Sequence, residues 1–265
     1  MVRRIVIGAL ALIALLVLGV GGVMLADGFL LQQATDYTNV SYTADDGTTV
    51  YGYLALPEAE GVYPAVLMVH EWWGLNAEIV EMAETLAEEG YVVLAPDTYR
   101  TRLATTVPGA LLLRLSVPEQ QADMDMIAAF DFLAGLPNVD PLRIGVMGFC
   151  YGGGVALRHA TQNPQIAATI NLYGDTILDP NGFGALLDSG RPLLGIFGAQ
   201  DNQIPVSEVE AFEAALAQTS IPHEVTIYPG VGHAFVNPAS IAEPGAAQEA
   251  WAQILAFFET NLKQL

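Results

Sequence analysis

Cysteine and basic residues are both scarce in this chain. Cys150 is the only cysteine among 265 residues, so an intrachain disulfide and a metal site made of several cysteines are excluded. Nine lysines and arginines stand against 29 aspartates and glutamates, and the formal net charge is −20. A surface this acidic repels nucleic acid and anionic lipid headgroups, so neither is an expected partner of the folded part. No glycine pattern of the dinucleotide-binding kind follows the first expected strands, and we expect no cofactor and no metal.

Charge is also missing from a long stretch near the N-terminus. No charged residue separates Arg4 from Asp27, and residues 5–26 are mostly Ile, Leu, Val, Ala and Gly. As a helix this stretch would span roughly 33 Å, enough to cross the hydrocarbon core of a bilayer. We therefore expect residues 1–27 to be a single-pass membrane anchor; the alternative is a cleaved signal sequence, although Met24-Leu25-Ala26 makes a poor cleavage site. The arginines before the apolar stretch predict a cytoplasmic N-terminus and a catalytic domain outside the cytoplasm.

After a connector at 28–37, residues 38–265 have the pattern of one α/β domain, which we expect to be monomeric. Short apolar runs alternate with segments of helical periodicity, which predicts a mostly parallel sheet covered by helices on both faces. The region 97–118 is less regular. The expected strands are Val40–Thr43, Thr48–Leu56, Ala65–Val69, Tyr91–Ala95, Ile144–Phe149, Ala167–Leu172, Pro192–Phe197 and His223–Tyr228. The expected helices are Asn76–Glu89, Gln120–Leu136, Val155–Thr161, Ser207–Ala217 and Ala246–Leu262.

The most informative motif is Gly148-Phe149-Cys150-Tyr151-Gly152. It lies between an apolar run that predicts a buried strand and a run that predicts a helix. Glycines two residues on either side of Cys150 are typical of a sharp strand-to-helix turn with a nucleophile at its apex, because larger side chains would collide there. The alternative for the motif alone is a buried structural thiol in a glycine-rich turn.

Two other strand ends carry the groups that a cysteine nucleophile requires. Asp201 follows the expected strand at 192–197, and His233 follows the expected strand at 223–228 in a glycine-flanked loop. A histidine can take the thiol proton and return it to the leaving group, while a carboxylate fixes the histidine tautomer. We predict these roles for His233 and Asp201, although Asp201 could instead be an acid at the start of the next helix. The order nucleophile, acid, histidine along the chain is that of the α/β-hydrolases.

The loop His70-Glu71-Trp72-Trp73-Gly74 follows another expected strand end. In this fold an oxyanion is held by the N–H of the residue after the nucleophile and by one N–H of such a loop, which points to Tyr151 and Trp72. Glu71 adds a carboxylate at the rim of the same site, unless it is a solvated loop acid. We expect Trp72 and Trp73 to form pocket walls rather than a surface patch.

Together these motifs resemble the dienelactone hydrolase family of α/β-hydrolases, over roughly residues 41–261. The similarity is carried by six ordered motifs, namely Gly148-Phe149-Cys150-Tyr151-Gly152-Gly153, His70-Glu71-Trp72-Trp73-Gly74, Ala95-Pro96-Asp97-Thr98-Tyr99, Tyr173-Gly174, Gly198-Ala199-Gln200-Asp201 and Gly232-His233-Ala234-Phe235. The resemblance implies a triad of Cys150, His233 and Asp201 that hydrolyses an ester or lactone through a thioester. It also implies that Glu71 holds the resting thiol until substrate displaces it. A pocket for a compact acyl group is expected, walled by Trp72, Trp73, Tyr99, Tyr173 and Phe235.

The chain departs from the family pattern at the residues that grip a substrate carboxylate. Members that act on dienelactone place one arginine four residues after the aspartate of the Asp-x-Tyr motif, where Thr101 stands here. They place another four residues after the catalytic histidine, where Asn237 stands. Arg100 and Arg102 flank Thr101 and are the expected substitutes. The expected function is therefore hydrolysis of small carboxylic esters or lactones, with no preference for dienelactone itself.

Other functions of the same fold remain open at this point. A thioesterase or a peptidase would favour a larger cap than the region 97–118 can supply. A non-catalytic thiol sensor or binding protein is also possible, since a fold does not fix a function. The ordered nucleophile, acid and histidine, together with Glu71, favour the ester or lactone hydrolase.

Overall fold

The computed structural model describes residues 19, 21, 22 and 34–264, and in this part strands and helices alternate. The strands are β1 (Val40–Thr43), β2 (Thr49–Ala55), β3 (Tyr63–Val69), β4 (Val92–Pro96), β5 (Val139–Phe149), β6 (Ala168–Leu172), β7 (Leu193–Gly198) and β8 (His223–Tyr228). The α-helices are α2 (Ala77–Glu88), α3 (Val107–Ser116), α4 (Glu119–Ala134), α5 (Tyr151–Gln162), α6 (Ala185–Ser189), α7 (Val206–Leu216), α8 (Pro238–Ile241) and α9 (Ala246–Phe258). Short helical turns are η1 (Ala34–Tyr37), η2 (Pro180–Phe183) and η3 (Glu259–Lys263).

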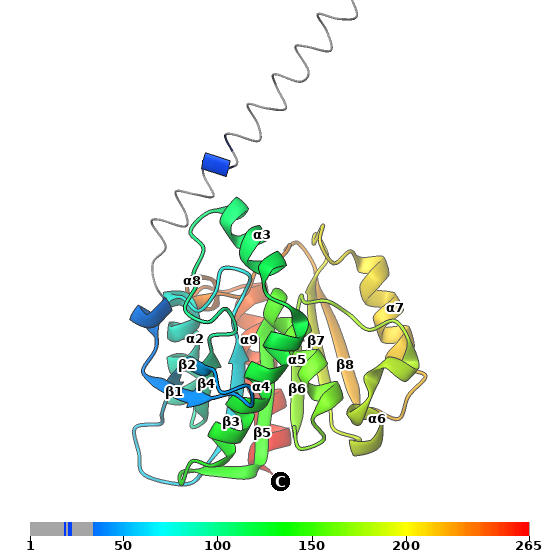
Figure 1. Ribbon diagram of the computed structural model, residues 1–265. Coiled ribbons are helices and arrows are strands. Elements are labelled where there is room, and N and C mark those ends of the chain that lie inside the picture. The colour runs from blue at the N-terminus through cyan, green and yellow to red at the C-terminus, as the bar shows by residue number, and fades with distance from the viewer. Residues whose placement is uncertain (1–18, 20, 23–33, 265) are drawn as a thin grey trace, which may run out of the picture.

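The strands form one sheet in the order β1-β2-β4-β3-β5-β6-β7-β8 (Figure 1). β1 and β2 run antiparallel to their neighbours, and the pairs from β4 to β8 are parallel. The last residues of neighbouring parallel strands are in register, as in the pairs Val69 with Gly148 and Gly198 with Tyr228. The loops that follow β3, β5, β7 and β8 therefore meet at one edge of the sheet, where such folds bind their ligands.

Helices cover both faces of the sheet. Every residue of β4, β6 and β7 is buried, which explains their uninterrupted apolar sequences. In β5, Gly145 faces Phe258 of α9, whereas Gly148 faces the start of α5. Residues three apart in a strand point to opposite faces, so α9 and α5 lie on opposite sides. Figure 1 shows α4 and α5 in front of the sheet and α2 and α9 behind it. The predicted mostly parallel sheet with helices on both faces is confirmed.

The region 97–118, predicted to be less regular, contains the ten-residue helix α3. The Thr106 side chain caps it by accepting a hydrogen bond from the backbone N–H of Gly109 at 3.2 Å. Only three of its residues, Gly109, Ala110 and Leu113, are buried. This narrow buried side gives a weak helical pattern, which is why the periodicity of the sequence did not reveal the helix.

The predicted membrane segment, residues 5–26, lies outside the described residues apart from 19, 21 and 22. Within the part of the chain that the structure describes, no helix is long and apolar enough to cross a membrane. The longest helix there, α4, has 16 residues. At about 1.5 Å per residue it falls short of a hydrocarbon core about 30 Å thick. The expected localisation, a single-pass membrane-anchored protein with its catalytic domain outside the cytoplasm, is corrected on this finding, and no membrane location is assigned.

Candidate active site

Cys150 lies at the apex of the turn between β5 and α5. Its backbone has φ 53° and ψ −118°, a conformation that is costly for a residue with a side chain. A Cβ on Gly148 would overlap the carbonyl of Gly152, and a Cβ on Gly152 would overlap the carbonyl of Val69. The backbone N–H of Cys150 donates a hydrogen bond to the carbonyl of Leu172 at 3.0 Å. The turn is thus fixed between β3 and β6, and the thiol stands at the carboxyl edge of the sheet.

The loops after β7 and β8 bring Asp201 and His233 together. Nδ1 of His233 lies 2.7 Å from Oδ2 of Asp201, so the ring N–H donates to a carboxylate whose side chain is fully buried. The other carboxylate oxygen accepts the backbone N–H groups of Gln203 and Ile204, at 2.7 and 3.1 Å. Nε2 of His233 has no hydrogen-bond partner among the described residues. An imidazole oriented in this way can accept a proton at Nε2.

Cys150 and His233 line one cavity, which has a volume of about 250 Å³. The backbone N–H groups of Tyr151 and Trp72 act on the Cys150 thiol and favour its ionised form, so both amides face the sulfur. Two amides that converge on one point from separate segments are the arrangement that stabilises an oxyanion. The remaining wall of the cavity consists of Arg114, Tyr173, Gly174, Asp175, Gln203 and Ile204.

Cys150 and Glu71 both have raised pKa values. Burial, and after it the charge of Glu71, raises the pKa of the Cys150 thiol to about 12, against the opposing effect of the two N–H donors. The thiol is therefore protonated at neutral pH. Burial, and after it the charge of Glu78, raises the pKa of the Glu71 carboxyl to about 7. Glu71 also lines a second cavity of about 210 Å³, which α2 and the segment after His233 enclose.

His70 fixes the loop that carries Glu71 and Trp72. It is fully buried, and burial lowers the pKa of its ring to about 4, so the ring is neutral. Its Nδ1 donates to the Glu71 carbonyl at 2.6 Å, and its Nε2 accepts from the Thr98 hydroxyl at 2.9 Å. Both ring nitrogens are therefore occupied, and His70 has no nitrogen left to act as a base.

The aromatic residues predicted to wall the pocket do not all reach it. Trp72 and Tyr173 line the cavity at the thiol, and Trp73 lines the second cavity with its ring 5.2 Å from that of Trp72. Tyr99 and Phe235 line neither of these two cavities. Tyr99 is fully buried, and the ring of Phe235 packs 5.7 Å from that of Tyr173. The predicted contact of Tyr99 and Phe235 with substrate is corrected: they support the wall from behind.

Arg100 does not face the cavity. Its guanidinium donates hydrogen bonds to Asp125, the shortest at 2.8 Å, and lies 3.4 Å from Asp46. The Asp125 side chain is fully buried, so this pair holds the arginine firmly in place. The prediction that Arg100 binds a substrate carboxylate is corrected, because its charge is already neutralised by these two aspartates.

Arg102 is also turned away, and a different arginine takes the place beside the thiol. Arg102 donates hydrogen bonds to the carbonyl of Tyr99 at 3.0 Å and to the hydroxyl of Ser116 at 2.9 Å, and it lines neither cavity. Arg114 of α3 lines the thiol cavity, with its guanidinium 5.0 Å from the centre of the Tyr151 ring. Sequence reasoning missed Arg114; an arginine inside an apolar run of a chain poor in basic residues was the available signal.

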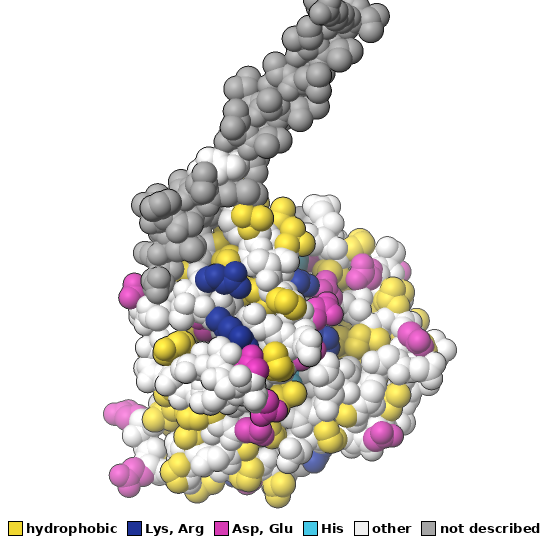
Figure 2. Space-filling view, viewed as in Figure 1, with side chains coloured by type: hydrophobic (Ala, Val, Ile, Leu, Met, Phe, Trp, Pro, Cys, Tyr) yellow, Lys and Arg dark blue, Asp and Glu magenta, His cyan; other side chains and the backbone are white. Residues whose placement is uncertain are grey.

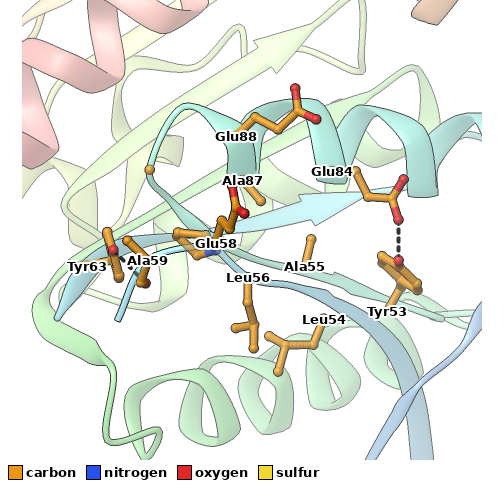
Figure 3. A pocket seen from close by; sticks show the side chains of 12 residues that line it. Tyr53, Leu54, Ala55, Leu56, Glu58, Ala59, Tyr63, Glu84, Ala87 and Glu88 are labelled. Carbon is orange, nitrogen blue, oxygen red and sulfur yellow. Dashed lines mark hydrogen bonds between the residues drawn. The ribbon is translucent and has the colours of Figure 1, made fainter. Parts of the chain in front are cut away.

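A larger cavity, of about 810 Å³, lies away from Cys150, between β2 and the second half of α2 (Figure 3). At its rim the hydroxyl of Tyr53 donates to Glu84 at 2.5 Å. Its lining includes the acids Glu58, Glu84 and Glu88 but no cysteine, serine or histidine, and none of its residues lines the thiol cavity. It lacks the pairing of a thiol with a carboxylate-oriented histidine that the smaller cavity has, so the smaller cavity is the candidate active site.

A mostly parallel sheet, a cysteine at a strand-to-helix turn and an acid and a histidine after later strands define an α/β-hydrolase fold. The sequence model of the dienelactone hydrolase family matches residues 50–262, and this protein belongs to that family of hydrolases.

Similar proteins agree with this placement. A provisionally named carboxymethylenebutenolidase from Synechocystis sp. is 30% identical over 231 residues, 81% of this chain and 93% of its own length. Another protein of that provisional name, from Aquifex aeolicus, is 32% identical over 228 residues, 82% of this chain and 96% of its own. The crystal structure of a provisionally named dienelactone hydrolase from Klebsiella pneumoniae has a TM-score of 0.70 and 28% identity, covering 83% of this chain and 99% of its own. A dienelactone hydrolase-like promiscuous phosphotriesterase from metagenomic libraries has a TM-score of 0.72 at 23% identity, which shows the fold alone.

Proposed function

We propose that this protein hydrolyses small carboxylic esters or lactones, with Cys150 as nucleophile, His233 as base and acid, and Asp201 as the group that orients the histidine. The observation that carries the proposal is Nε2 of His233, which lacks a partner among the described residues in a cavity shared with Cys150. The 2.7 Å bond from Nδ1 to Asp201 keeps the lone pair on Nε2. We assign the catalytic unit to residues 38–265.

The proposed reaction has two halves. In the first, the Cys150 sulfur attacks the carbonyl carbon while its proton passes to Nε2 of His233, and the carbonyl electron pair moves to oxygen. The amides of Trp72 and Tyr151 hold this oxyanion, an effect worth roughly 2.7–4 kcal/mol per donor in comparable sites. Collapse expels the alkoxide, which takes the proton from His233 and leaves a thioester on Cys150.

In the second half, water attacks the thioester carbonyl and passes one proton to His233. Collapse of this intermediate breaks the carbon–sulfur bond, releases the acid, and returns the proton from His233 to the Cys150 sulfur. Throughout, the buried carboxylate of Asp201 stabilises the imidazolium that forms twice in each turnover. No group beyond these residues and water is needed for the balance.

Between turnovers the thiol is unreactive. A pKa of about 12 leaves very little thiolate, and the two amides that would hold the oxyanion face the sulfur instead. We propose that Glu71 keeps the thiol in this state and that a substrate carbonyl displaces the sulfur when it enters. The thiol would then be released towards His233 only when substrate is present.

The cavity suits a compact acyl group. Its volume of about 250 Å³ is small, and Trp72 and Tyr173 supply apolar walls. We propose that Arg114 binds an anionic group on the substrate, in place of the two positions where this chain lacks an arginine. Esters and lactones should react better than peptides, because a tetrahedral intermediate expels thiolate more easily than amine. A compact cavity that has no cap beyond α3 among the described residues also favours this function over a peptidase.

The test is a set of steady-state assays with 4-nitrophenyl acetate, a dienelactone and a matched peptide amide. We expect ester and lactone turnover, and loss of it in Cys150→Ala. A covalent adduct on Cys150, seen by mass spectrometry after acid quenching, would establish the thioester. Full ester turnover by Cys150→Ala, or amide cleavage as fast as ester cleavage, would refute the proposal. A non-catalytic thiol sensor would show neither turnover nor an adduct.

A further inference from the structure

The outward face of α3 is apolar. Nine large hydrophobic side chains are exposed in the described part of the chain, and four of them lie on this ten-residue helix. They are Val107, Leu111, Leu112 and Leu115, with exposed fractions of 57, 49, 40 and 72%. A surface helix normally turns its apolar side chains to the core and its polar ones to water. An apolar outer face of this kind marks a site of contact with another surface.

Helical spacing puts these four side chains on one stripe. Val107, Leu111 and Leu115 recur every four residues, and Leu112 adjoins them. The residues that α3 buries lie on its opposite side. Figure 2 shows hydrophobic side chains gathered over α3, with Lys or Arg side chains beside them.

Cationic groups lie at both borders of the stripe. In helical projection Arg114 stands at one border, between Val107 and the buried Ala110. At the other border the hydroxyl of Ser116 accepts a hydrogen bond from Arg102 at 2.9 Å. Within residues 34–264 neither arginine forms an ion pair. In a chain with a formal charge of −20, two arginines that form no ion pair within this part of the chain therefore lie beside one apolar stripe.

We propose that α3 docks reversibly on a phospholipid surface with zwitterionic headgroups. The leucine stripe would enter the boundary of the acyl chains, and Arg102 at the Ser116 border would meet headgroup phosphates, as the cations of interfacial amphipathic helices do, while Arg114 stays in the cavity. The net charge of −20 opposes binding to a strongly anionic surface, which favours headgroups without net charge.

Docking would also turn the active site towards the lipid. Arg114 lines the Cys150 cavity and borders the stripe, so the cavity lies beside the docking face. Esters dissolved in the lipid layer would then reach the thiol without crossing bulk water. This consequence, unlike the docking itself, rests on the proposed hydrolase function.

A second copy of the chain fits the stripe less well. A ten-residue helix is about 15 Å long, and one of its faces covers far less than the roughly 800 Å² that each partner buries in a standard interface. Two molecules of formal charge −20 also repel one another.

The first test follows the stripe with a fluorescent probe in the full chain. Cys150→Ser removes the natural thiol, so that a new cysteine at Leu111→Cys or Leu142→Cys can carry an environment-sensitive dye. Position 142 is the control, because Leu142 is 75% exposed but lies near the start of β5 rather than on α3. On adding phosphatidylcholine vesicles we expect a blue shift at position 111, quenched by lipid-borne nitroxide, and none at 142. Vesicles rich in anionic lipid should give a weaker shift. A second pair of labelled proteins carries the dye at Val107→Cys, and one member of the pair also carries Leu111→Asp and Leu115→Asp. The two aspartates should abolish the shift at position 107.

Three outcomes with the probes at 111 and 142 would overturn the docking proposal. The first is an equal spectral shift at positions 111 and 142. The second is a shift that grows with protein concentration in the absence of lipid, which would indicate binding of a second copy of the chain. The third is a probe at position 111 that is already buried and does not respond to vesicles. A shift at 107 that persists with the two aspartates would also refute it, because binding would then come from elsewhere in the chain.

The second test measures activity with the natural Cys150 in place. Leu111→Asp with Leu115→Asp should lower turnover of a 4-nitrophenyl ester dissolved in phosphatidylcholine vesicles by about tenfold or more. Turnover of water-soluble 4-nitrophenyl acetate should stay within about twofold, since neither leucine lines the thiol cavity. Leu142→Asp is the matched control and should change neither. Equal turnover of the vesicle ester would refute the link between docking and activity, whereas absence of acetate turnover in the unaltered protein would refute the proposed function instead.

Discussion

The guanidinium of Arg114 lies 5.0 Å from the centre of the Tyr151 ring. α3 thus places a cation over the residue whose backbone N–H reaches the thiol sulfur of Cys150. The cation and the ring attract one another, which orients the arginine towards the cavity although no carboxylate within residues 34–264 pairs with it. A charge held by an aromatic face remains available to a ligand.

This arrangement predicts selective loss of anionic substrates in Arg114→Gln. We expect KM for the 4-nitrophenyl monoester of succinate to rise about tenfold or more, because a charge-assisted hydrogen bond is lost. KM for the neutral 4-nitrophenyl butyrate should change little. Arg191→Gln removes the same charge far from the cavity and should leave both values unchanged. Equal losses on both esters would show that Arg114 supports the wall of the site and binds no anion.

Asp201→Asn should lower kcat by roughly 10³–10⁴-fold while the fold is retained. The amide can donate to Nδ1 of His233, which would then carry its proton on Nε2 and could not accept one from the thiol. Circular dichroism and thermal unfolding would check that structure is preserved. Asp131→Asn, an exposed aspartate of α4, serves as the control. A loss below about tenfold would demote Asp201 from the proposed triad.

Glu71→Gln should speed alkylation of Cys150 by iodoacetamide at pH 8 and slow ester turnover. Burial and the charge of Glu71 both raise the pKa of the thiol, and the substitution removes the second cause. A gain of about three- to tenfold in alkylation rate corresponds to half a unit to one unit of pKa. The difference from the unaltered protein should fade below about pH 7, where Glu71 itself becomes protonated. Identical rates across the pH range would reduce Glu71 to a loop acid.

The same substitution should stabilise the protein at high pH. Burial raises the pKa of Glu71 to about 7 in the folded state from 4.5, so the folded state binds its proton more tightly than the unfolded state. The stability that this proton provides is complete below about pH 4.5 and is lost as the pH rises through about 7. Glu71→Gln stays neutral, so we expect its free energy of unfolding to be higher at pH 8 by on the order of 1–3 kcal/mol. Urea unfolding at pH 8 and pH 4.5 measures this, and an equal difference at both values would contradict it.

The positions of Cys150, Asp201 and His233 at one edge of the sheet could be predicted because each follows an apolar run that ends a parallel strand. Strand ends meet by topology, so spacing along the chain is enough to bring these residues to one edge. The direction in which a single side chain points could not be predicted in this way. Arg100 and Tyr99 stand in a loop that also ends a strand, yet one pairs with buried Asp125 and the other is fully buried.

The orientations of Arg100 and Tyr99 depend on residues that lie far from them in the sequence. The Asp125 side chain comes from α4, and its need for a cation decides where Arg100 points. Arg114 was not predicted because the helix that carries it, α3, was not predicted. Apolar residues lie on both the buried and the exposed face of α3, so its sequence lacks the alternation of apolar and polar faces that identifies an amphipathic helix. The pKa of Glu71 could not be predicted either, since it follows from burial rather than from neighbours in the chain.

The lack of a side chain at Gly152 determines which part of this fold could be exchanged without disturbing the site. The backbone of α5 lies directly on the carbonyl groups of Val69 and His70, and this close contact holds the loop of Trp72 against the start of the helix that carries Tyr151. α3, by contrast, is attached at the rim. A designer could therefore exchange α3 for another segment, and so change which molecules enter, while the residues to which we assign the acyl transfer are left untouched.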